Sequence, residues 1–107
     1  MARHDEMPSL SRKESLIMEI LLENPAIELY GLELVRKSGK RLKRGTVYVT
    51  LARLQEKGFI DSHQEEPDPT VPGTPRRLYK ATGYGKRVYE LLQLAFQARK
   101  LSEADAI

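Results

Sequence analysis

The residues of this chain best suited to chemistry lie between positions 44 and 58, in the segment RGTVYVTLARLQEKG. Small polar and basic side chains recur there at spacings of three and four residues: Thr46, Thr50, Arg53 and Lys57. Such spacing places side chains on one face of a helix. Hydroxyl, guanidinium and ammonium groups bond phosphate oxygens and base edges. The pattern therefore predicts a surface that contacts nucleic acid.

The same segment carries an apolar face that can hold the helix on a core. Val47, Leu51 and Leu54 recur at helical spacing. Gly58 follows, where helices commonly end in the left-handed conformation, and Phe59 opens a β-prone run. A short helix with a polar and basic outer face that leads into a hairpin is typical of a winged helix-turn-helix.

Positive charge is concentrated around this helix. The 107-residue chain has a net charge of only +3. Between Arg36 and Lys57, however, eight basic residues accompany one acid, Glu56. We expect Lys43 and Arg44, just before the helix, to neutralise phosphates. Charge alone also fits a solvated helix face, since charge runs are common on helices.

Two candidate contacts have alternative roles that the sequence leaves open. Arg53 could bond guanine bidentately, or it could bind a phosphate or water alone. Tyr48 flanks both faces of the helix, where a phosphate contact and a packing role are equally compatible with its chemistry.

Two helices should precede this segment. Ser11 and Glu14 have capping-box spacing, and the apolar stripe that follows, Leu16, Ile17, Ile20 and Leu21, predicts a helix that ends at Asn24-Pro25. A second helix is predicted over Tyr30–Ser38, with Gly39 as its stop. The short basic bridge 40–44 then favours a helix-turn-helix.

A hairpin should follow. Phe59–Glu65 and Arg77–Ala81 are predicted as paired strands, joined by a loop with four prolines, Glu66–Arg76. In position and length this loop is a wing. Its acidic residues would be repelled by phosphate, so we expect contact at Arg76 and Arg77, which alternate in direction.

Thr82 is predicted as the N-cap of a last helix that runs to about Leu101. Its apolar stripe is wider than a small domain needs. We expect a second copy of the chain to cover it at Val88, Leu91, Leu92, Ala95, Phe96 and Leu101. The alternative is that the helix folds back onto its own domain.

Composition argues against an enzyme and against a cofactor. The chain has no cysteine, and its two histidines, His4 and His63, are isolated. The adjacent His4, Asp5 and Glu6 converge poorly as metal ligands. The N-terminus lacks an apolar targeting region and no apolar run could span a bilayer, so we expect a soluble, cytoplasmic chain without membrane contact.

Between about Ser15 and Leu94 the motifs resemble the PadR family of bacterial winged-helix transcriptional regulators. The matching pieces are LIMEILLENP, LYGLELV, GTVYVTLARLQEKGFI and PRRLYKATGYGKR. Residues 45–48 match the family's GTVY, Leu51 and Leu54 its core leucines, and residues 76–77 its basic pair in the wing. Arg44 and Val49 stand where relatives have proline.

The resemblance implies a homodimer paired through C-terminal helices, with the third helix in the major groove and the wing near the backbone or minor groove. The single C-terminal helix corresponds to the short form of the family. Some relatives bind aromatic or drug-like ligands between the helices of the dimer, so a small aromatic effector is a further expected partner.

We thus predict an α+β winged helix-turn-helix with a three-helix core, a two-stranded wing and a C-terminal dimerisation helix. Residues 1–82 would form the DNA-binding domain and residues 83–107 the dimerisation helix and tail. The predicted function is repression by a homodimer on a pseudo-palindromic operator in double-stranded DNA. The alternatives are a winged-helix protein-interaction module and, given a pocket, a small-molecule sensor or enzyme.

Overall fold

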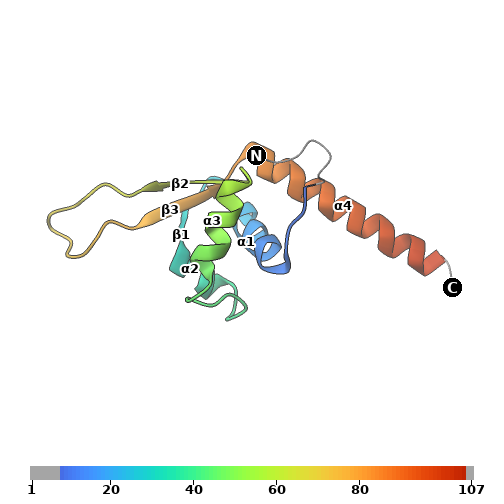
Figure 1. Cartoon of the computed structure of the whole chain (residues 1–107), viewed down its shortest axis with the longest axis horizontal. Coiled ribbons are helices and arrows are strands. Elements are labelled where there is room, and N and C mark those ends of the chain that lie inside the picture. Colours follow the sequence, from blue (N-terminus) through green and yellow to red (C-terminus); the bar gives the residue numbers. More distant parts are fainter. Residues whose placement is uncertain (1–7, 106–107) are drawn as a thin grey trace.

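The computed structural model describes residues 8–105 as a helix-turn-helix body with two projections (Figure 1). The predicted α+β winged helix with a C-terminal helix is confirmed. His4, Asp5 and Glu6, considered above as metal ligands, lie outside the described residues. The elements in chain order are α1 (Arg12–Glu23), β1 (Leu29–Tyr30), α2 (Gly31–Lys37), α3 (Val47–Glu56), β2 (Ile60–Gln64), β3 (Arg77–Ala81) and α4 (Gly83–Asp105).

Helix α1 begins as its capping box predicts. The Glu14 amide donates to Ser11 Oγ at 3.1 Å, and the Ser11 amide donates to Glu14 Oε1 at 2.8 Å. The predicted apolar stripe is buried except for Leu16, which is half-buried, and Met18 joins it with no exposed surface. This stripe forms one wall of the core, whose other walls come from α2, α3 and the sheet.

The sheet has three antiparallel strands in the order β1-β3-β2. The hairpin β2–β3 matches the predicted strands to within one residue at each end. Strand β1 was not predicted, because two residues are too short to show an alternating pattern. It pairs Leu29 with Tyr79 and so attaches the start of α2 to the wing.

A rigid turn joins α2 to α3. Gly39 and Lys40 both adopt left-handed backbone conformations, with φ of 62° and 73°. The buried Ser38 hydroxyl donates to the Val35 carbonyl at 2.6 Å and accepts from the Leu42 amide at 2.9 Å. Leu42 itself is buried in the core. The turn therefore has a fixed position despite its exposed charges.

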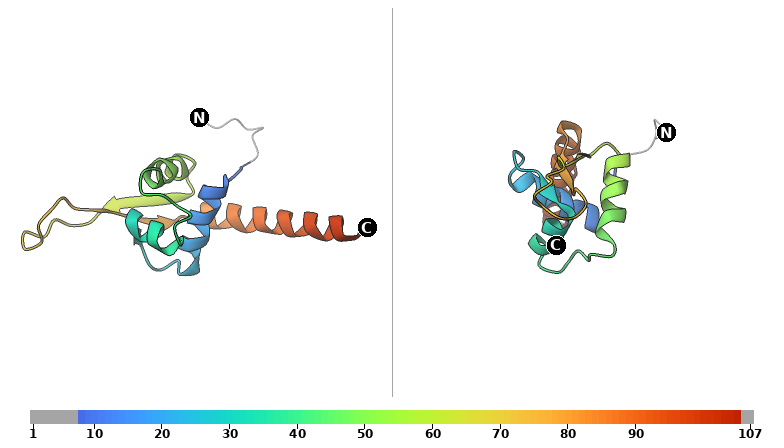
Figure 2. Two further views of the ribbon diagram at one scale, coloured as in Figure 1. Left: turned by 90° about the horizontal axis from the view of Figure 1, so that it is seen from below. Right: turned by 90° about the vertical axis from the view of Figure 1, so that its left-hand side faces the viewer.

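Helix α4 starts at the predicted cap, where Thr82 Oγ1 accepts from the Gly85 amide at 2.9 Å. It continues to Asp105, beyond the expected end near Leu101. Figure 2 shows that α4 leaves the body on the side opposite the wing, and the long axis of the molecule reaches 62 Å. No helix within residues 8–105 has the length and apolarity that a bilayer span requires.

Candidate nucleic-acid interface

Helix α3 presents two stripes of opposite character, each with spacing i, i+3, i+4, i+7. The inner stripe is buried and consists of Val47, Thr50, Leu51 and Leu54. The outer stripe is exposed and consists of Val49, Ala52, Arg53 and Glu56. The apolar face predicted from the sequence is therefore confirmed, but the polar face lies differently from the prediction.

The expectation that Thr50 lies on the outer face is wrong. Thr50 is only 7% exposed, and its hydroxyl donates to the Thr46 carbonyl at 3.2 Å. The reason is its position three residues after Val47 and four before Leu54, on the core side of α3. Val49 and Ala52 take the exposed places instead, and helical spacing from Arg53 could have identified both from the sequence.

The residues just before α3 are exposed and well fixed. The Lys43 carbonyl accepts from the amides of Thr46, at 3.1 Å, and Val47, at 2.9 Å. Thr46 is the N-cap of α3 but makes no side-chain capping bond, and its exposed hydroxyl instead donates to the Lys43 carbonyl at 3.4 Å. Arg44 is exposed in the same turn. These groups lie at the end of α3 that a winged helix inserts into DNA.

Tyr48 combines the two roles that the sequence left open, because it is 48% exposed and also packs on α2. A Cβ built on Gly31 would lie 2.6 Å from Tyr48 Cε1, so the ring occupies the space that a side chain at position 31 would take. Gly31 therefore allows α2 and the start of α3 to approach closely, and the ring is held at the edge of the exposed face.

Lys57 is occupied by contacts within the domain. Its Nζ donates to Glu14 Oε1 at 3.0 Å and to the Ser9 carbonyl at 3.2 Å, and it lies 2.8 Å from Glu14 Oε2. Burial raises the pKa of Glu14, but the bonds from Lys57 and Ser11 outweigh burial, so the pKa lies below its ordinary value. The ammonium of Lys57 thus compensates a buried carboxylate and is already engaged within the domain.

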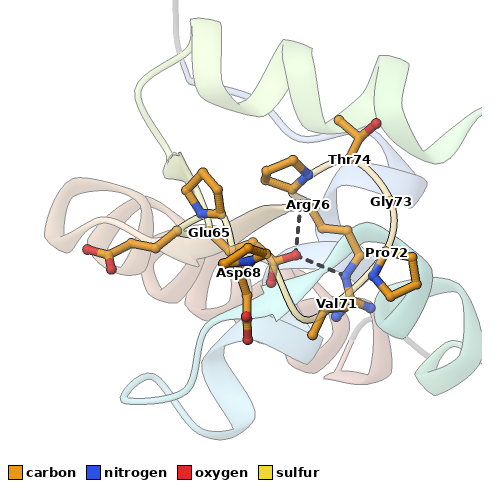
Figure 3. Close-up of a pocket in the computed structure, with 11 residues that line it drawn as sticks. Glu65, Asp68, Val71, Pro72, Gly73, Thr74 and Arg76 are labelled. Carbon is orange, nitrogen blue, oxygen red and sulfur yellow. Dashed lines mark hydrogen bonds and ion pairs between the residues drawn. The ribbon is translucent and has the colours of Figure 1, made fainter.

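Three side chains in non-covalent contact hold the base of the wing together. Tyr30 donates its hydroxyl proton to Glu65 Oε2 at 2.7 Å, and the Arg76 guanidinium lies 3.9 Å from the centre of the Tyr30 ring. Arg76 also approaches Glu65 through its amide, at 2.9 Å, and Nε, at 3.4 Å, as Figure 3 shows. Arg76 immediately precedes β3, and the two arginines alternate in direction as expected, because Arg76 lies against Tyr30 and Arg77 bonds Ser62 on the other face.

The other wing residues that could contact DNA differ in exposure and in charge. Arg77 is exposed and donates to Ser62 Oγ at 3.0 Å. The loop between β2 and β3 carries the acids Glu65, Glu66 and Asp68 around an open hollow (Figure 3).

His63 is not isolated, because its Nε2 contacts the carboxylate of Glu28. Within residues 8–105, no three acidic or histidine side chains gather as a metal site would need.

The predicted dimerisation residues divide into two groups on α4. Val88 is buried in the domain's own core, and Leu92 is half-buried beside it. Leu91, Phe96 and Leu101 are 65%, 52% and 68% exposed, and Ala95 is exposed as well. Figure 2 shows the distal part of α4 projecting from the body, and Ala95 and Phe96 line a hollow shared with the start of α1. Leu94, which is not among the predicted dimerisation residues, is 66% exposed.

Comparison with known proteins identifies the family. Residues 17–91 match the sequence profile of the transcriptional regulator PadR-like family. The chain belongs to this family. PadR-like proteins are transcriptional regulators rather than enzymes, in agreement with the resemblance that the motifs indicate. No curated protein matches the chain.

Solved structures share this fold, among them two PadR-like regulators. A PadR family transcription regulator from Clostridium difficile is 26% identical, with a TM-score of 0.70 over 89% of this chain and 97% of that one. A PadR-like transcription factor from Bacteroides fragilis is 24% identical, with a TM-score of 0.73 over 90% and 93%. The PcaV regulator of Streptomyces coelicolor, solved with its natural ligand, shares the fold at 20% identity and a TM-score of 0.68 over 92% and 63%.

Proposed function

We propose that this PadR-like chain is a sequence-specific DNA-binding repressor that acts as a homodimer on a pseudo-palindromic operator. The observation that carries the proposal is the uncovered outer stripe of α3, which lies beside a fixed turn with the exposed cations Lys43 and Arg44. A major groove admits one helix, and phosphates on its walls attract flanking cations.

Within this proposal the contacts have separate roles. Arg53 and the Tyr48 ring approach base edges or the adjacent backbone, whereas Lys43, Arg44 and Thr46 bind phosphates at the start of α3. Arg77 meets the backbone beside the wing. Arg76 contributes mainly by holding the wing in place, because its guanidinium is already engaged with Tyr30 and Glu65.

We propose that residues 1–82 form the DNA-binding domain together with the first turns of α4, whose Val88 completes its core, and that the remainder of the 83–107 segment provides dimerisation. Support comes from a row of exposed side chains on α4, Leu91, Leu94, Ala98 and Leu101, which we call the α4 seam. Its alternating spacings of three and four residues are those of a coiled-coil interface. A second copy is a suitable occupant because it offers the same seam.

Repression would follow from competition with the transcription machinery for the operator. Half-site geometry must match the distance between the two recognition helices, about one helical turn of DNA. An effector that binds between the copies and changes this distance would release the DNA. A small aromatic effector is our proposal by family analogy. A related fold, PcaV, was solved with its natural ligand.

A mobility-shift assay with the DNA upstream of the protein's own gene, at two salt concentrations, tests the proposal. We expect a specific shift that weakens steeply with salt, with a log–log slope of about −0.9 per neutralised phosphate. Lys43→Ala should weaken binding to operator and random duplex alike. Arg53→Ala should mainly reduce the discrimination between them.

The charge-matched control is Lys100→Ala, because Lys100 is exposed on distal α4 and lies outside the α4 seam. It should bind like the wild type. Failure of the wild type to shift any duplex at low salt would contradict DNA binding and favour a protein-interaction module. Equal losses in all three variants would contradict a role for α3.

A further inference from the structure

The outer stripe of α3 contains two apolar side chains where a DNA-binding surface usually presents polar ones. Val49 is 54% exposed, and Ala52 is exposed one turn later. Neither belongs to the hydrophobic core or to the residues packed against it. Their exposure has no explanation in the stability of the domain, because the inner stripe alone holds α3 in place.

The charged residues around this apolar pair indicate what kind of partner it contacts. Arg53 is on the same stripe, which also carries one acid, Glu56, at its far end, and Lys43 and Arg44 lie in the turn at the N-terminal end of the helix. A partner protein with an apolar surface would not favour so many cations next to the apolar contact. A polyanion that carries apolar groups fits both features. The major groove offers one such group, the C5-methyl of thymine.

We propose that Val49 and Ala52 recognise the C5-methyl groups of thymines in the operator, and that Arg53 bonds a guanine beside them. The proposal rests on the DNA-binding function above and assigns part of its specificity. Val49 and Ala52 are about 4.5 Å apart along the helix axis, at about 1.5 Å per residue. Base pairs are stacked about 3.4 Å apart. The two side chains can therefore meet methyl groups on neighbouring base pairs.

The chemistry predicts a particular selectivity. Neither side chain can donate or accept a hydrogen bond, so neither distinguishes bases by their polar edges. Each gains affinity only from the apolar surface of the methyl group. Burial of one methyl corresponds to about a fourfold change in affinity, so two would give about fifteenfold. Deoxyuridine keeps the hydrogen-bonding edge of thymidine and lacks only this methyl.

The experiment begins with affinity selection of the full-length protein on a random duplex library. In the best selected duplex, each thymidine is then replaced singly by deoxyuridine, and dissociation constants are measured at fixed salt. We expect about a fourfold loss at one or two adjacent thymines of each half-site. Replacement of the same thymine by 5-methylcytosine, with guanine opposite, should recover the methyl-dependent part of the affinity.

Variants then assign the methyl contacts to residues. Val49→Ala should reduce the deoxyuridine effect at one thymine, and Ala52→Ser should reduce it at the neighbouring one. Both positions are exposed, and circular dichroism would verify that the variants fold. Arg53→Ala is the matched control from the same stripe, and it should keep both methyl effects while losing the preference for guanine.

The outcomes separate this proposal from the function on which it rests. Enrichment of a duplex that tolerates deoxyuridine everywhere, or that lacks thymine in its half-sites, would overturn methyl recognition and leave DNA binding intact. Persistence of the full deoxyuridine effect in both variants would also overturn it. If no duplex is enriched, the proposed DNA-binding function fails, and methyl recognition fails with it.

Discussion

Gly85 lies so close to Phe59 that the Phe59 carbonyl occupies the space of a side chain at position 85. A Cβ there would lie 2.0 Å from the Phe59 oxygen. The same carbonyl accepts from the Thr82 amide at 3.0 Å, and the Thr82 hydroxyl donates to the Gly58 carbonyl at 2.8 Å. The first turn of α4 is thereby joined, through the Thr82 amide and hydroxyl, to backbone carbonyls of the segment that leaves α3.

Substitution of Gly85 should therefore be far more damaging than its helical position implies. Because backbone atoms cannot yield as a side-chain tip does, we expect Gly85→Ala to cost at least about 3 kcal/mol of unfolding free energy. Gly83→Ala is the control. Its Cβ would meet only the Arg87 guanidinium at 3.6 Å, so it should be neutral or stabilising. Urea unfolding of both variants checks this, and equal stabilities would contradict the contact.

Gly31→Ala should act through Tyr48. The new Cβ would lie 2.6 Å from Tyr48 Cε1, but the half-exposed ring can swing away. We expect a loss of about 1 to 2 kcal/mol, and almost none when Tyr48 is already alanine. A double-mutant cycle from chemical denaturation measures this coupling. Additive losses would mean that the ring does not impose the requirement for glycine.

The Glu14–Lys57 pair should make stability depend on pH. Because the pKa of Glu14 is lower in the folded chain, the unfolded state binds more protons, and the stabilisation is present above the ordinary value of 4.5. It is lost as pH falls through the lowered pKa. At neutral pH, Glu14→Gln should cost about 1 to 2 kcal/mol, since Lys57 is partly exposed.

The loss caused by Glu14→Gln should shrink well below pH 4.5, where the wild-type carboxylate is protonated. Glu19→Gln, an exposed position on the same helix, is the control and should change stability little at either pH. Denaturation curves at neutral and acidic pH give both differences. A constant difference across pH would show that the charge of Glu14 does not stabilise the folded chain.

Tyr30 should ionise at higher pH than a free tyrosine. Its hydrogen bond to the Glu65 carboxylate favours the protonated phenol and is the main cause of a raised pKa, above the ordinary 10.0. The difference in ultraviolet titration between wild type and Tyr30→Phe isolates this group. Glu65→Gln should bring its pKa back toward 10.0. An unshifted titration in the wild type would contradict the bond at the base of the wing.

The α4 seam predicts the oligomeric state. Leu94→Glu puts a charge in its centre and should convert a dimer into monomers at micromolar concentration, as measured by sedimentation velocity. Lys100→Glu introduces a carboxylate on the same helix away from the seam and should remain dimeric. A dimer that survives Leu94→Glu would exclude the seam as the interface.

Local signals in the sequence predicted most of the elements. The Ser11–Glu14 box, the Thr82 cap and the left-handed Gly58, with φ of 81°, depend on neighbouring residues and are found as expected. The two-residue strand β1 has no such local signal, because only its pairing with β3 defines it.

The candidate site was harder to predict, because its side chains depend on partners distant in sequence. Lys57 and Glu14 are 43 residues apart, and Tyr30 and Glu65 are 35 apart. Neither pairing could be inferred from a single sequence. Thr50, by contrast, was misplaced by giving its polarity more weight than its helical position beside Leu54.

In the proposed dimer, the length of α4 beyond the body would link folding to protein concentration. Every side chain from Leu94 to Ala104 is exposed, so this stretch gains almost no tertiary stabilisation within one chain. Beyond the turns that pack on the domain, each further helical residue is only marginally favourable in water, so in a lone copy the last turns of α4 would fray. Dimerisation would then have to offset the entropy that is lost when the last turns of α4 become ordered. Dilution should consequently lower the apparent melting temperature and open this end to proteases first.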